Sequence, residues 1–503
     1  MLIKLSIVLL YLAVLIGIGF LASRRMKNLR DYFAAGKKLG FLTVAFSARA
    51  TGESAWLLLG LTGMGAAVGL KAFWVVLGEV LGVAFAWIFM ARRFKRLTDE
   101  YDSITIPDYL ESRFRDKSHH LRLVSAAKLV IFVTIYVSAQ IFATGKAFNS
   151  FLDWNFYLGA IIGFGVVLVY SVAGGFLAVA WSDVFQGSLM ILGLVFLPVF
   201  GLVSIGGWSS LTTSLNSIDP ALMTITGAGG WSIINIASIF SLALIGLGFM
   251  GSPQIFVRFI ALKEEKEIPK GTVVAILWTL FADSGAVLTG IVGRSLLTGP
   301  NDTLESVLGE NAEAVLPMLV DSLLPMFLVG LYIAIVLSAI MSTVDSLLLV
   351  ASSAAVRDYY QKVRHPNLKD DELVGLSRKV TIAIALIALC IALFVAWLTK
   401  GGTIFWFVIF GWGGIAATFC PTIILSLFWR GMTANGAIAA MITGFVCIPI
   451  FNFWAPHWPG VGEFFSQLSE LPPAFLLSGI MGVLVSIFMP QNHTERHRKT
   501  IEN

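Results

Sequence analysis

Charge is what this sequence has least of. Charged residues fill 13% of its 503 positions and hydrophobic residues fill 57%, whereas an average soluble domain is roughly 25% charged. Apolar runs of about 20 residues, the length that crosses the ~30 Å hydrocarbon core of a bilayer, recur along the whole chain. This recurrence excludes a water-soluble enzyme that is held to the membrane by one anchor.

Cysteine and histidine are also scarce. Cys390, Cys420 and Cys447 lie in apolar stretches, without the spacing of a disulfide framework or a zinc clamp. Because neither a metal cluster nor a nucleophile–base pair is predicted at membrane depth, we expect no enzyme activity. The six histidines fall in predicted loops or the C-terminal tail, without HExxH spacing: His119, His120, His365, His457, His493 and His497.

The apolar runs form thirteen segments, which predicts an all-α polytopic membrane protein with about thirteen transmembrane helices. The first segment lacks a basic leader beyond Lys4 and a small-residue cleavage site, so we expect a helix rather than a signal peptide. The segments span residues 4–22, 40–68, 72–91, 122–150, 156–178, 183–206, 231–257, 270–296, 316–355, 376–398, 402–429, 433–452 and 473–489.

Lysine and arginine concentrate in alternate connections. The 207–230 and 453–472 stretches contain none, and 298–315 is acidic. The positive-inside rule then predicts an amino terminus outside and a cytoplasmic carboxyl terminus. Termini on opposite sides of the membrane require an odd number of spans, which agrees with thirteen. The net charge of +5 thus reflects topology and not a nucleic-acid surface. The residues assigned to the cytoplasmic side are Arg24, Arg25, Lys27, Arg30, Lys37, Lys38, Arg92, Arg93, Lys95, Arg96, Arg113, Arg115, Lys117, Arg258, Lys263, Lys266, Lys270, Arg357, Lys362, Arg364, Lys369, Arg430, Arg496, Arg498 and Lys499.

Two of the segments are interrupted at mid-depth. Residues 48–54 read Ala-Arg-Ala-Thr-Gly-Glu-Ser, and the seventh segment contains three glycines and a proline within 246–253. The two interruptions lie five helices apart, as expected for inverted repeats, and unwound helices at matching positions indicate a transporter binding site. Glycines that simply pack helices together are the alternative.

Four stretches then resemble one family. Residues 47–61 (SARATGESAWLLLGL), 106–118 (IPDYLESRFRDKS), 173–183 (AGGFLAVAWSD) and 337–346 (LSAIMSTVDS) are similar to motifs of the sodium:solute symporter family, most of all its bacterial sodium/proline symporters. The similarity runs from about residue 30 to about residue 490, in the same order.

The resemblance implies a LeuT-type fold with a five-plus-five inverted repeat. It divides the chain into a first helix and basic loop (1–39), two repeats of five helices (40–206 and 207–429), and two peripheral helices with a short tail (430–503). It also implies import of a small organic solute by symport with sodium, through alternating access in a bacterial inner membrane. The expected partners are the solute, sodium and the lipid bilayer.

The resemblance places the principal sodium ion between two segments. It implies the backbone carbonyls of Ala50, Glu53 and Ala339 and the hydroxyls of Ser342 and Thr343 as ligands. These are the hard oxygen ligands that sodium prefers. Ordinary hydrogen bonding between helices is the alternative for the two hydroxyls.

A second sodium site or an ion exit path is implied at Asp183, with Asp345 and Ser346 near it. An ionisable residue inside a membrane span is costly and therefore indicates function. The alternative for Asp183 is a helix-capping residue at the membrane boundary.

The solute pocket departs from the proline pattern. The acidic residue of proline symporters is replaced by Gly52, and Ile245 and Phe249 stand where tryptophan and tyrosine are expected. These changes remove polar contacts, which set specificity more than apolar contacts do, so a different solute is plausible. The positions that the resemblance assigns to solute binding are Thr51, Ser54, Ala55, Trp56, Tyr136, Gln140, Ile245, Gly246 and Phe249.

Three unusual charges accompany this pocket: Arg49, Glu53 and Asp283. Glu53 either contacts a cationic group of the solute, or adds charge to the sodium site, or forms a structural pair with Arg49. A buried charge needs a partner, so a compensated network is the favoured interpretation.

The sequence is compatible with several functions. An amino acid, with proline foremost, is the expected cargo of the sodium symport. Another carboxylate or small solute is the alternative, as is a transporter-like sensor that acts with a separate signalling partner. An ion channel is disfavoured, because the sequence contains no repeated filter motif.

Overall fold

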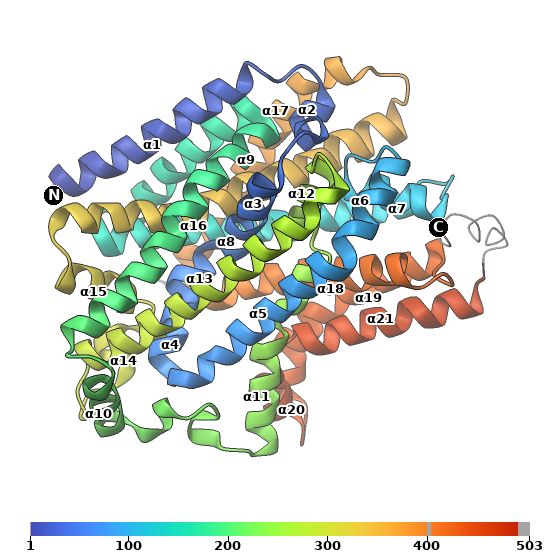
Figure 1. The fold of residues 1–503 in the computed structure, drawn as a ribbon. Coiled ribbons are helices and arrows are strands. Elements are labelled where there is room, and N and C mark those ends of the chain that lie inside the picture. The colour runs from blue at the N-terminus through green and yellow to red at the C-terminus, as the bar shows by residue number, and fades with distance from the viewer. Residues whose placement is uncertain (1, 400–403, 491–503) are drawn as a thin grey trace.

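The computed structural model describes residues 2–399 and 404–490, and within them the chain is a bundle of helices (Figure 1). Eleven helical runs of this part are long and apolar enough to cross a membrane. Two runs, Phe41–Glu100 and Phe156–Ser204, each contain two of the thirteen predicted segments, so both counts describe the same helices. The other runs are Leu2–Ser23, His120–Leu152, Ile233–Ala261, Glu265–Leu297, Met326–Arg364, Val374–Thr399, Val408–Phe428, Ala434–His457 and Leu471–Phe488.

The helix bounds follow the apolar segments closely, and one segment is divided. The predicted span 316–355 is interrupted by Pro325, which begins a new helix because proline lacks a backbone N–H. The helices are α1 (Leu2–Ser23), α2 (Leu29–Ala34), α3 (Phe41–Ala55), α4 (Thr62–Val68), α5 (Phe73–Phe85), α6 (Ala91–Glu100), α7 (Ile106–Phe114), α8 (His120–Leu152), α9 (Phe156–Ser204), α10 (Trp208–Ile218), α11 (Ile233–Leu244), α12 (Pro253–Ala261), α13 (Ile268–Leu297), α14 (Leu304–Leu308), α15 (Val315–Leu323), α16 (Met326–Ser353), α17 (Val374–Thr399), α18 (Ile404–Phe428), α19 (Ala434–Pro449), α20 (Gly462–Leu468) and α21 (Leu471–Phe488).

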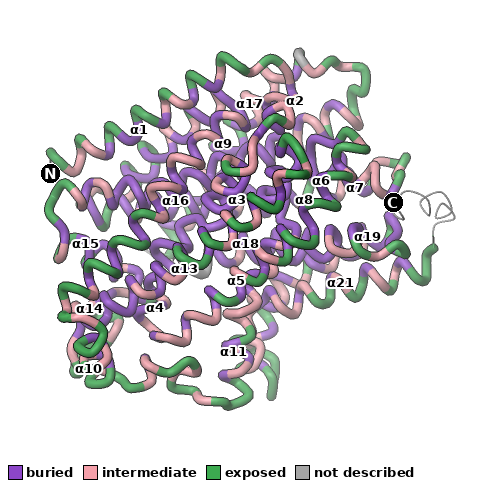
Figure 2. Tube along the Cα trace, viewed as in Figure 1, coloured by how far each residue is buried: buried purple, intermediate pink, exposed green. Residues whose placement is uncertain are grey.

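Burial separates an inner group of helices from an outer one. In the most apolar windows of α16 and α18, 83% of residues are buried, against 33% in α1, α17 and α21. Figure 2 shows the same division, with buried residues gathered along α3, α16 and α18 and exposed residues along the margins at α1 and α21. Apolar side chains exposed on the marginal helices are what lipid contact requires.

Small residues let the inner helices approach closely. A Cβ atom on Gly246 would lie 1.9 Å from the backbone carbonyl oxygen of Gly78, and one on Gly82 would lie 2.1 Å from that of Gly246. Only glycine fits at such distances, because any Cβ atom would overlap the facing carbonyl oxygen. Close van der Waals contact of this kind holds helices together in lipid, where no hydrophobic driving force acts between them. The contact fixes α5 against the short 3₁₀ segment η7 (Ile245–Met250).

Both predicted interruptions coincide with departures from regular helix. In the first, Ser54 has φ 58° and ψ −167°, so α3 breaks at the end of the predicted stretch and continues as a π-helical turn, η2 (Trp56–Leu61). In the second, α11 passes through η7 to Gly251 at φ 152°, a conformation open mainly to glycine, before α12 begins. A third bend, which the sequence analysis missed, lies inside α9 at Gly175, with φ 56°.

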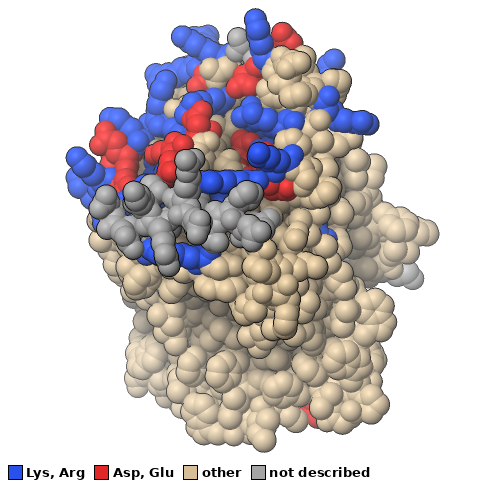
Figure 3. All heavy atoms as spheres, turned by 90° about the vertical axis from the view of Figure 1, so that its right-hand side faces the viewer, with Lys and Arg blue, Asp and Glu red and all other residues tan. Residues whose placement is uncertain are grey.

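Charge gathers at one end of the bundle. The start of α1 lies at the end that carries α10 and α14, opposite the end with α2, α6 and α7 (Figure 1). Figure 3 looks onto that second end and shows lysine and arginine, interspersed with acidic residues, over the upper part of the face. Three basic residues of the predicted cytoplasmic tail, Arg496, Arg498 and Lys499, lie outside the described residues.

Arg258 corrects the sequence analysis, which counted it in a cytoplasmic connection. It lies within α12 and is fully buried. The helix that follows the second break ends at Ala261. Hydropathy ended the predicted segment at residue 257, before Arg258, because an arginine lowers the hydropathy of the segment.

Candidate functional site

The predicted sodium ligands meet where α3 crosses α16. The Ser342 hydroxyl lies 3.0 Å from the carbonyl oxygen of Ala50 and 3.2 Å from that of Ala339. The Thr343 hydroxyl lies 3.0 Å from the carbonyl oxygen of Thr51 and 3.2 Å from that of Ala339. All five residues are buried. Two hydroxyls therefore converge with three carbonyls in a space that water does not reach.

Glu53, the remaining predicted ligand, lies nearly one turn further along α3. Its carbonyl accepts the backbone N–H of Trp56 across the break. The carbonyl of Thr51, a residue that the sequence analysis assigned to the solute, also belongs to the group around Thr343. Such carbonyl and hydroxyl oxygens at a broken helix can replace the hydration shell of a small hard cation.

The residues predicted for a second ion lie beside this group. Ser47 donates to Asp183 Oδ2 over 2.6 Å, and Tyr170 donates to Asp345 Oδ2 over 2.8 Å. The Ser346 hydroxyl is 3.2 Å from Asp345 Oδ1. Asp183 is fully buried in the middle of α9 and not at a helix end, so the capping interpretation is wrong.

Arg258 lies between these carboxylates and the predicted sodium ligands. Its Nη2 donates to Thr51 Oγ1 over 2.7 Å, to Asp183 Oδ2 over 3.3 Å, and to Ser346. Its Nε donates to Ser47 Oγ over 3.1 Å. A fixed cation thus neutralises Asp183 from within the protein. The sequence could have indicated this role, because Arg258 follows Pro253 by only five residues and a helix that begins at this proline would still include it.

A second charged group surrounds the break of α3. Arg49 pairs with Glu53 in an ion pair, and its Nη2 lies 3.8 Å from Oε2 of Glu79 on α5. Trp56 Nε1 donates to Glu79 Oε1 over 3.3 Å. Asp283 of α13 joins the group, and all four charged residues are buried. The sequence analysis singled out three of them and missed Glu79. As a single carboxylate in an apolar segment, Glu79 was itself a sign of function.

Aromatic side chains close this charged group from one side. The Arg49 guanidinium lies 4.4 Å from the Phe249 ring centroid, a cation–π contact. Phe249 in turn lies 5.0 Å from Trp412, whose Nε1 donates to the carbonyl of Ile245 over 3.3 Å. Trp412 lies on α18, and the sequence analysis did not single it out.

The other predicted solute residues lie around the same break. Gln140 Oε1 accepts the backbone N–H of Ala55 over 3.0 Å. The hydroxyl of Ser54 accepts the backbone N–H of Trp56 over 3.2 Å. Tyr136 is fully buried on α8 and packs against Gly411 of α18. The broken segment of α3 is thereby held from α8, and Gly246 belongs to the facing segment η7.

A cavity of about 330 Å³ leads to this aromatic cover. Ile245 and Trp412 line one part of it, and Lys71 and Glu313 line another. Among the predicted solute residues, Ile245 alone lines this cavity within the described part of the chain. The cavity is therefore a vestibule that ends on Ile245 and Trp412, above Phe249.

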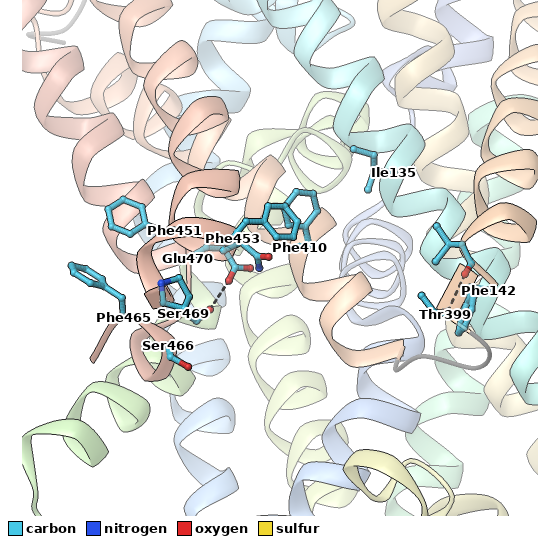
Figure 4. A pocket seen from close by; sticks show the side chains of 13 residues that line it. Ile135, Phe142, Thr399, Phe410, Phe451, Phe453, Phe465, Ser466, Ser469 and Glu470 are labelled. Atoms are coloured by element: carbon cyan, nitrogen blue, oxygen red, sulfur yellow. Dashed lines mark hydrogen bonds between the residues drawn. The ribbon is translucent and has the colours of Figure 1, made fainter. Parts of the chain in front are cut away.

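A larger cavity of about 690 Å³ lies apart from the predicted site (Figure 4). It is lined by aromatic side chains of α8, of α18 and of the chain after α19, with Ser469 donating to Glu470 at 2.9 Å. None of its lining residues in the described chain is one of the predicted sodium or solute residues, but Ser466 and Ser469 also line the vestibule, so the two cavities adjoin.

Comparison with known proteins identifies the family. The model of the sodium:solute symporter family matches residues 32–444. The chain is 37% identical over 471 residues to the high-affinity proline transporter PutP of Bacillus subtilis (strain 168). The matched region covers 93% of this chain and 95% of that transporter. The chain is 33% identical over 476 residues to a sodium/proline symporter of Salmonella typhimurium (strain LT2), with 94% and 91% covered.

Solved structures show the same fold. A sodium-coupled sialic acid symporter, solved in a substrate-bound outward-open state, matches with a TM-score of 0.79 at 18% identity and covers 97% of this chain and 98% of that one. At this identity the likeness shows the fold alone, which is the LeuT-type arrangement that the sequence predicted. With a family model across most of the chain, relatives above 30% identity and this fold, the protein belongs to the sodium:solute symporter family and carries a small solute in symport with sodium.

Proposed function

We propose that the chain imports an amino acid with sodium across a bacterial inner membrane, and that the ion binds between α3 and α16. The observation that carries the proposal is the convergence of the Ser342 and Thr343 hydroxyls with the carbonyls of Ala50, Thr51 and Ala339. The curated relatives are named as proline transporters, which supports an amino acid of similar size as the solute.

The orientation belongs to the same proposal. The amino terminus lies outside and the carboxyl terminus in the cytoplasm, which the gathering of lysine and arginine at the end with α2, α6 and α7 supports. The vestibule then opens to the outside. Residues 40–206 and 207–429 form the two inverted repeats, and their first helices carry the breaks at Ser54 and Gly251.

The ion site is tested by removing its hydroxyls. A contact to a charged partner contributes ~1.5–3 kcal/mol, so we expect Ser342→Ala or Thr343→Ala to raise the sodium concentration for half-maximal uptake about tenfold or more. The maximal rate at saturating sodium should change less. Uptake of radiolabelled amino acids into proteoliposomes, with an inward sodium gradient against a potassium control, measures both.

Ser338→Ala is the matched control. Ser338 lies one turn earlier on α16, where its hydroxyl contacts Ala334 and Tyr11, and we expect its sodium dependence to stay within twofold of the wild type. Unchanged sodium dependence in both the Ser342 and Thr343 variants would place the ion elsewhere. Absence of sodium-dependent uptake for every solute would overturn the proposed function itself.

A further inference from the structure

Three carboxylates from three different helices face one another beside the solute path. Glu53 of α3, Glu79 of α5 and Asp283 of α13 each offer an oxygen, and these oxygens lie within 4.8 Å of one another. All three residues are at most 1% exposed. They lie in membrane-spanning helices, where an ionised side chain without a partner is strongly disfavoured.

The protein supplies too little positive charge for this group. Among the described residues, Arg49 is the only lysine or arginine within 4.0 Å of these carboxylates, and it pairs with Glu53 and approaches Glu79. One guanidinium against three carboxylates leaves a formal charge of −2. Arg258, the next buried arginine, is occupied by Asp183, Thr51 and Ser346. Either a proton shared between two of the carboxylates or the cationic group of a bound molecule can balance this excess.

Asp283 supplies a separate observation that points to a ligand. It is fully buried, and apart from the facing carboxyl of Glu79 no residue that the structure describes forms a hydrogen bond with its oxygens. Oε2 of Glu79 also accepts no hydrogen bond from an N–H or O–H donor in this part of the chain, whereas Glu53 is paired with Arg49. Buried polar atoms are almost always hydrogen-bonded, so the open acceptors of Asp283 and Glu79 indicate where the donors of a ligand would lie.

The spacing fits the hydrogen bonds of an ammonium group. Three oxygens that lie within 4.8 Å of one another leave a central point at most about 2.8 Å from each, which is the length of a charge-assisted N–H···O bond. A primary ammonium group has three N–H donors and can give one to each carboxylate. The secondary ammonium of proline has only two.

We propose that Glu53, Glu79 and Asp283 bind the ammonium group of the transported solute, and that this solute is a cationic primary amine, such as a basic amino acid. The inference rests on the proposed function, because it assigns the solute class of the same transport site. Arg49 holds Glu53 in place, and Trp56 orients Glu79 through its indole N–H.

The vestibule provides the path to the carboxylates. It ends on Ile245 and Trp412, and Phe249 lies between Trp412 and Arg49. A solute that enters from the vestibule meets the aromatic rings first and reaches the carboxylates when Phe249 moves aside. The contact between Gly78 and Gly246 holds α5 against this path and so places Glu79, the next residue, beside it.

The test measures solute preference in the wild type, Glu79→Gln and Asp283→Asn. Each replacement keeps the shape and removes one charge. Radiolabelled lysine and proline are the probes, in proteoliposomes with an inward sodium gradient. We expect sodium-dependent lysine uptake, and a rise of at least tenfold in the lysine concentration for half-maximal uptake in both variants. Each lysine should carry one more positive charge across the membrane than a neutral amino acid does.

Glu470→Gln is the matched control. Glu470 is also buried, near the end of the bundle, with one oxygen that lacks a donor among the described residues. Its lysine uptake should stay within twofold of the wild type. Size-exclusion profiles and thermal unfolding show whether each variant is folded. If one is not, the concentrations of lysine and proline that stabilise the wild type against unfolding decide the preference.

Other outcomes overturn the inference and leave the proposed function standing. Sodium-dependent proline uptake with lysine inert means that the carboxylates do not select a cationic solute. Lysine affinity within twofold of the wild type in both variants has the same meaning. If Glu79→Gln and Asp283→Asn alter only the sodium or the proton dependence of neutral amino acid uptake, then the group holds a second sodium ion or a shared proton. Loss of sodium dependence for every solute would instead overturn the proposed function.

Discussion

At the scale of single residues, Arg258 balances the charge of Asp183, which would otherwise lack a cationic partner beside the proposed sodium ligands. It is fully buried, and the same guanidinium contacts Asp183, Thr51 and Ser346. Thr51 accepts a hydrogen bond from Thr343 through its carbonyl and from Arg258 through its hydroxyl. Arg258 therefore helps to position Thr51, a residue that also belongs to the proposed ion site.

Removal of this guanidinium should destabilise the protein. Arg258→Gln leaves Asp183 as a buried charge without its partner, a loss that typically costs about 3–5 kcal/mol. We expect a markedly lower unfolding temperature in detergent, and partial recovery in the double variant that adds Asp183→Asn. Arg96→Gln is the control, since the pair of Arg96 with Glu265 is exposed and contributes about 1 kcal/mol or less. Equal effects of the two single variants would contradict the role of Arg258.

The sequence could predict part of this site at the residue scale. Ser342 and Thr343 were predicted as ion ligands because they lie in a motif that resembles the family. In the structure their hydroxyls contact the carbonyls of Ala50 and Thr51. Glu79 and Arg258 were missed because their roles depend on which helix faces they meet. That pairing is set by helix packing and by close contacts such as that of Gly78 with Gly246, and no local pattern contains it.

At the scale of elements, an ionic cluster ties α7, α8 and the π-helical extension of α16, η10 (Ala354–Arg364), at the end rich in lysine and arginine. Arg122 donates to Asp108 Oδ1 over 2.7 Å and to Asp358 Oδ1 over 2.6 Å. Burial alone would raise the pKa of Asp108, but the guanidinium groups of Arg122 and Arg357 outweigh it and hold that pKa below its ordinary value. Asp108 therefore stays ionised throughout the physiological range.

Loss of Arg122 should separate these elements. Arg122→Gln leaves Asp358 buried without its cation and leaves Asp108, close to it, with Arg357 as its remaining partner. We expect faster hydrogen exchange in α7 and η10 and a lower unfolding temperature, since an unpaired buried charge costs about 3–5 kcal/mol. Adding Asp358→Asn should restore part of the loss. If exchange in α7 and η10 is unchanged in Arg122→Gln, the cluster does not hold the elements together.

The helix bounds show what hydropathy can and cannot predict about elements. The existence of the helices follows from apolar length, because a span needs about 20 residues whatever it packs against. The break at Ser54 could be placed only within a stretch of seven residues, since the left-handed conformation there is imposed by neighbours such as Gln140. The bend at Gly175 left no polar signal in α9, which reads as two apolar spans.

At the scale of the whole molecule, a cavity reaches the aromatic cover of the site from one end, and ion pairs bridge the helices at the other end. The vestibule reaches Ile245 and Trp412 from the proposed outer end. On the opposite side, Arg258 with Asp183 and Arg122 with Asp358 bridge the helices below the site. In the proposed orientation, this arrangement corresponds to an outward-facing state whose solute site is still covered by Phe249 and Trp412. We expect sodium to bind between α3 and α16 before the vestibule closes over the solute.

The state and the orientation can be tested together by cysteine labelling in intact cells. After replacement of Cys390, Cys420 and Cys447, a cysteine at Ser241 of the vestibule should react with a membrane-impermeant maleimide added outside. Sodium alone should leave the reaction at least as fast, because it stabilises the outward-facing state. Sodium with the transported solute should slow it severalfold, because closure buries the vestibule.

Two further positions serve as references for this experiment. Ser217, exposed near the end of α10, should react from outside at a rate that neither sodium nor solute changes. Ser118, exposed between α7 and α8, should react only after the cells are permeabilised. Reaction of Ser118 from outside would reverse the orientation and make the vestibule cytoplasmic. A rate at Ser241 that is the same with and without solute would show that the vestibule does not take part in alternating access.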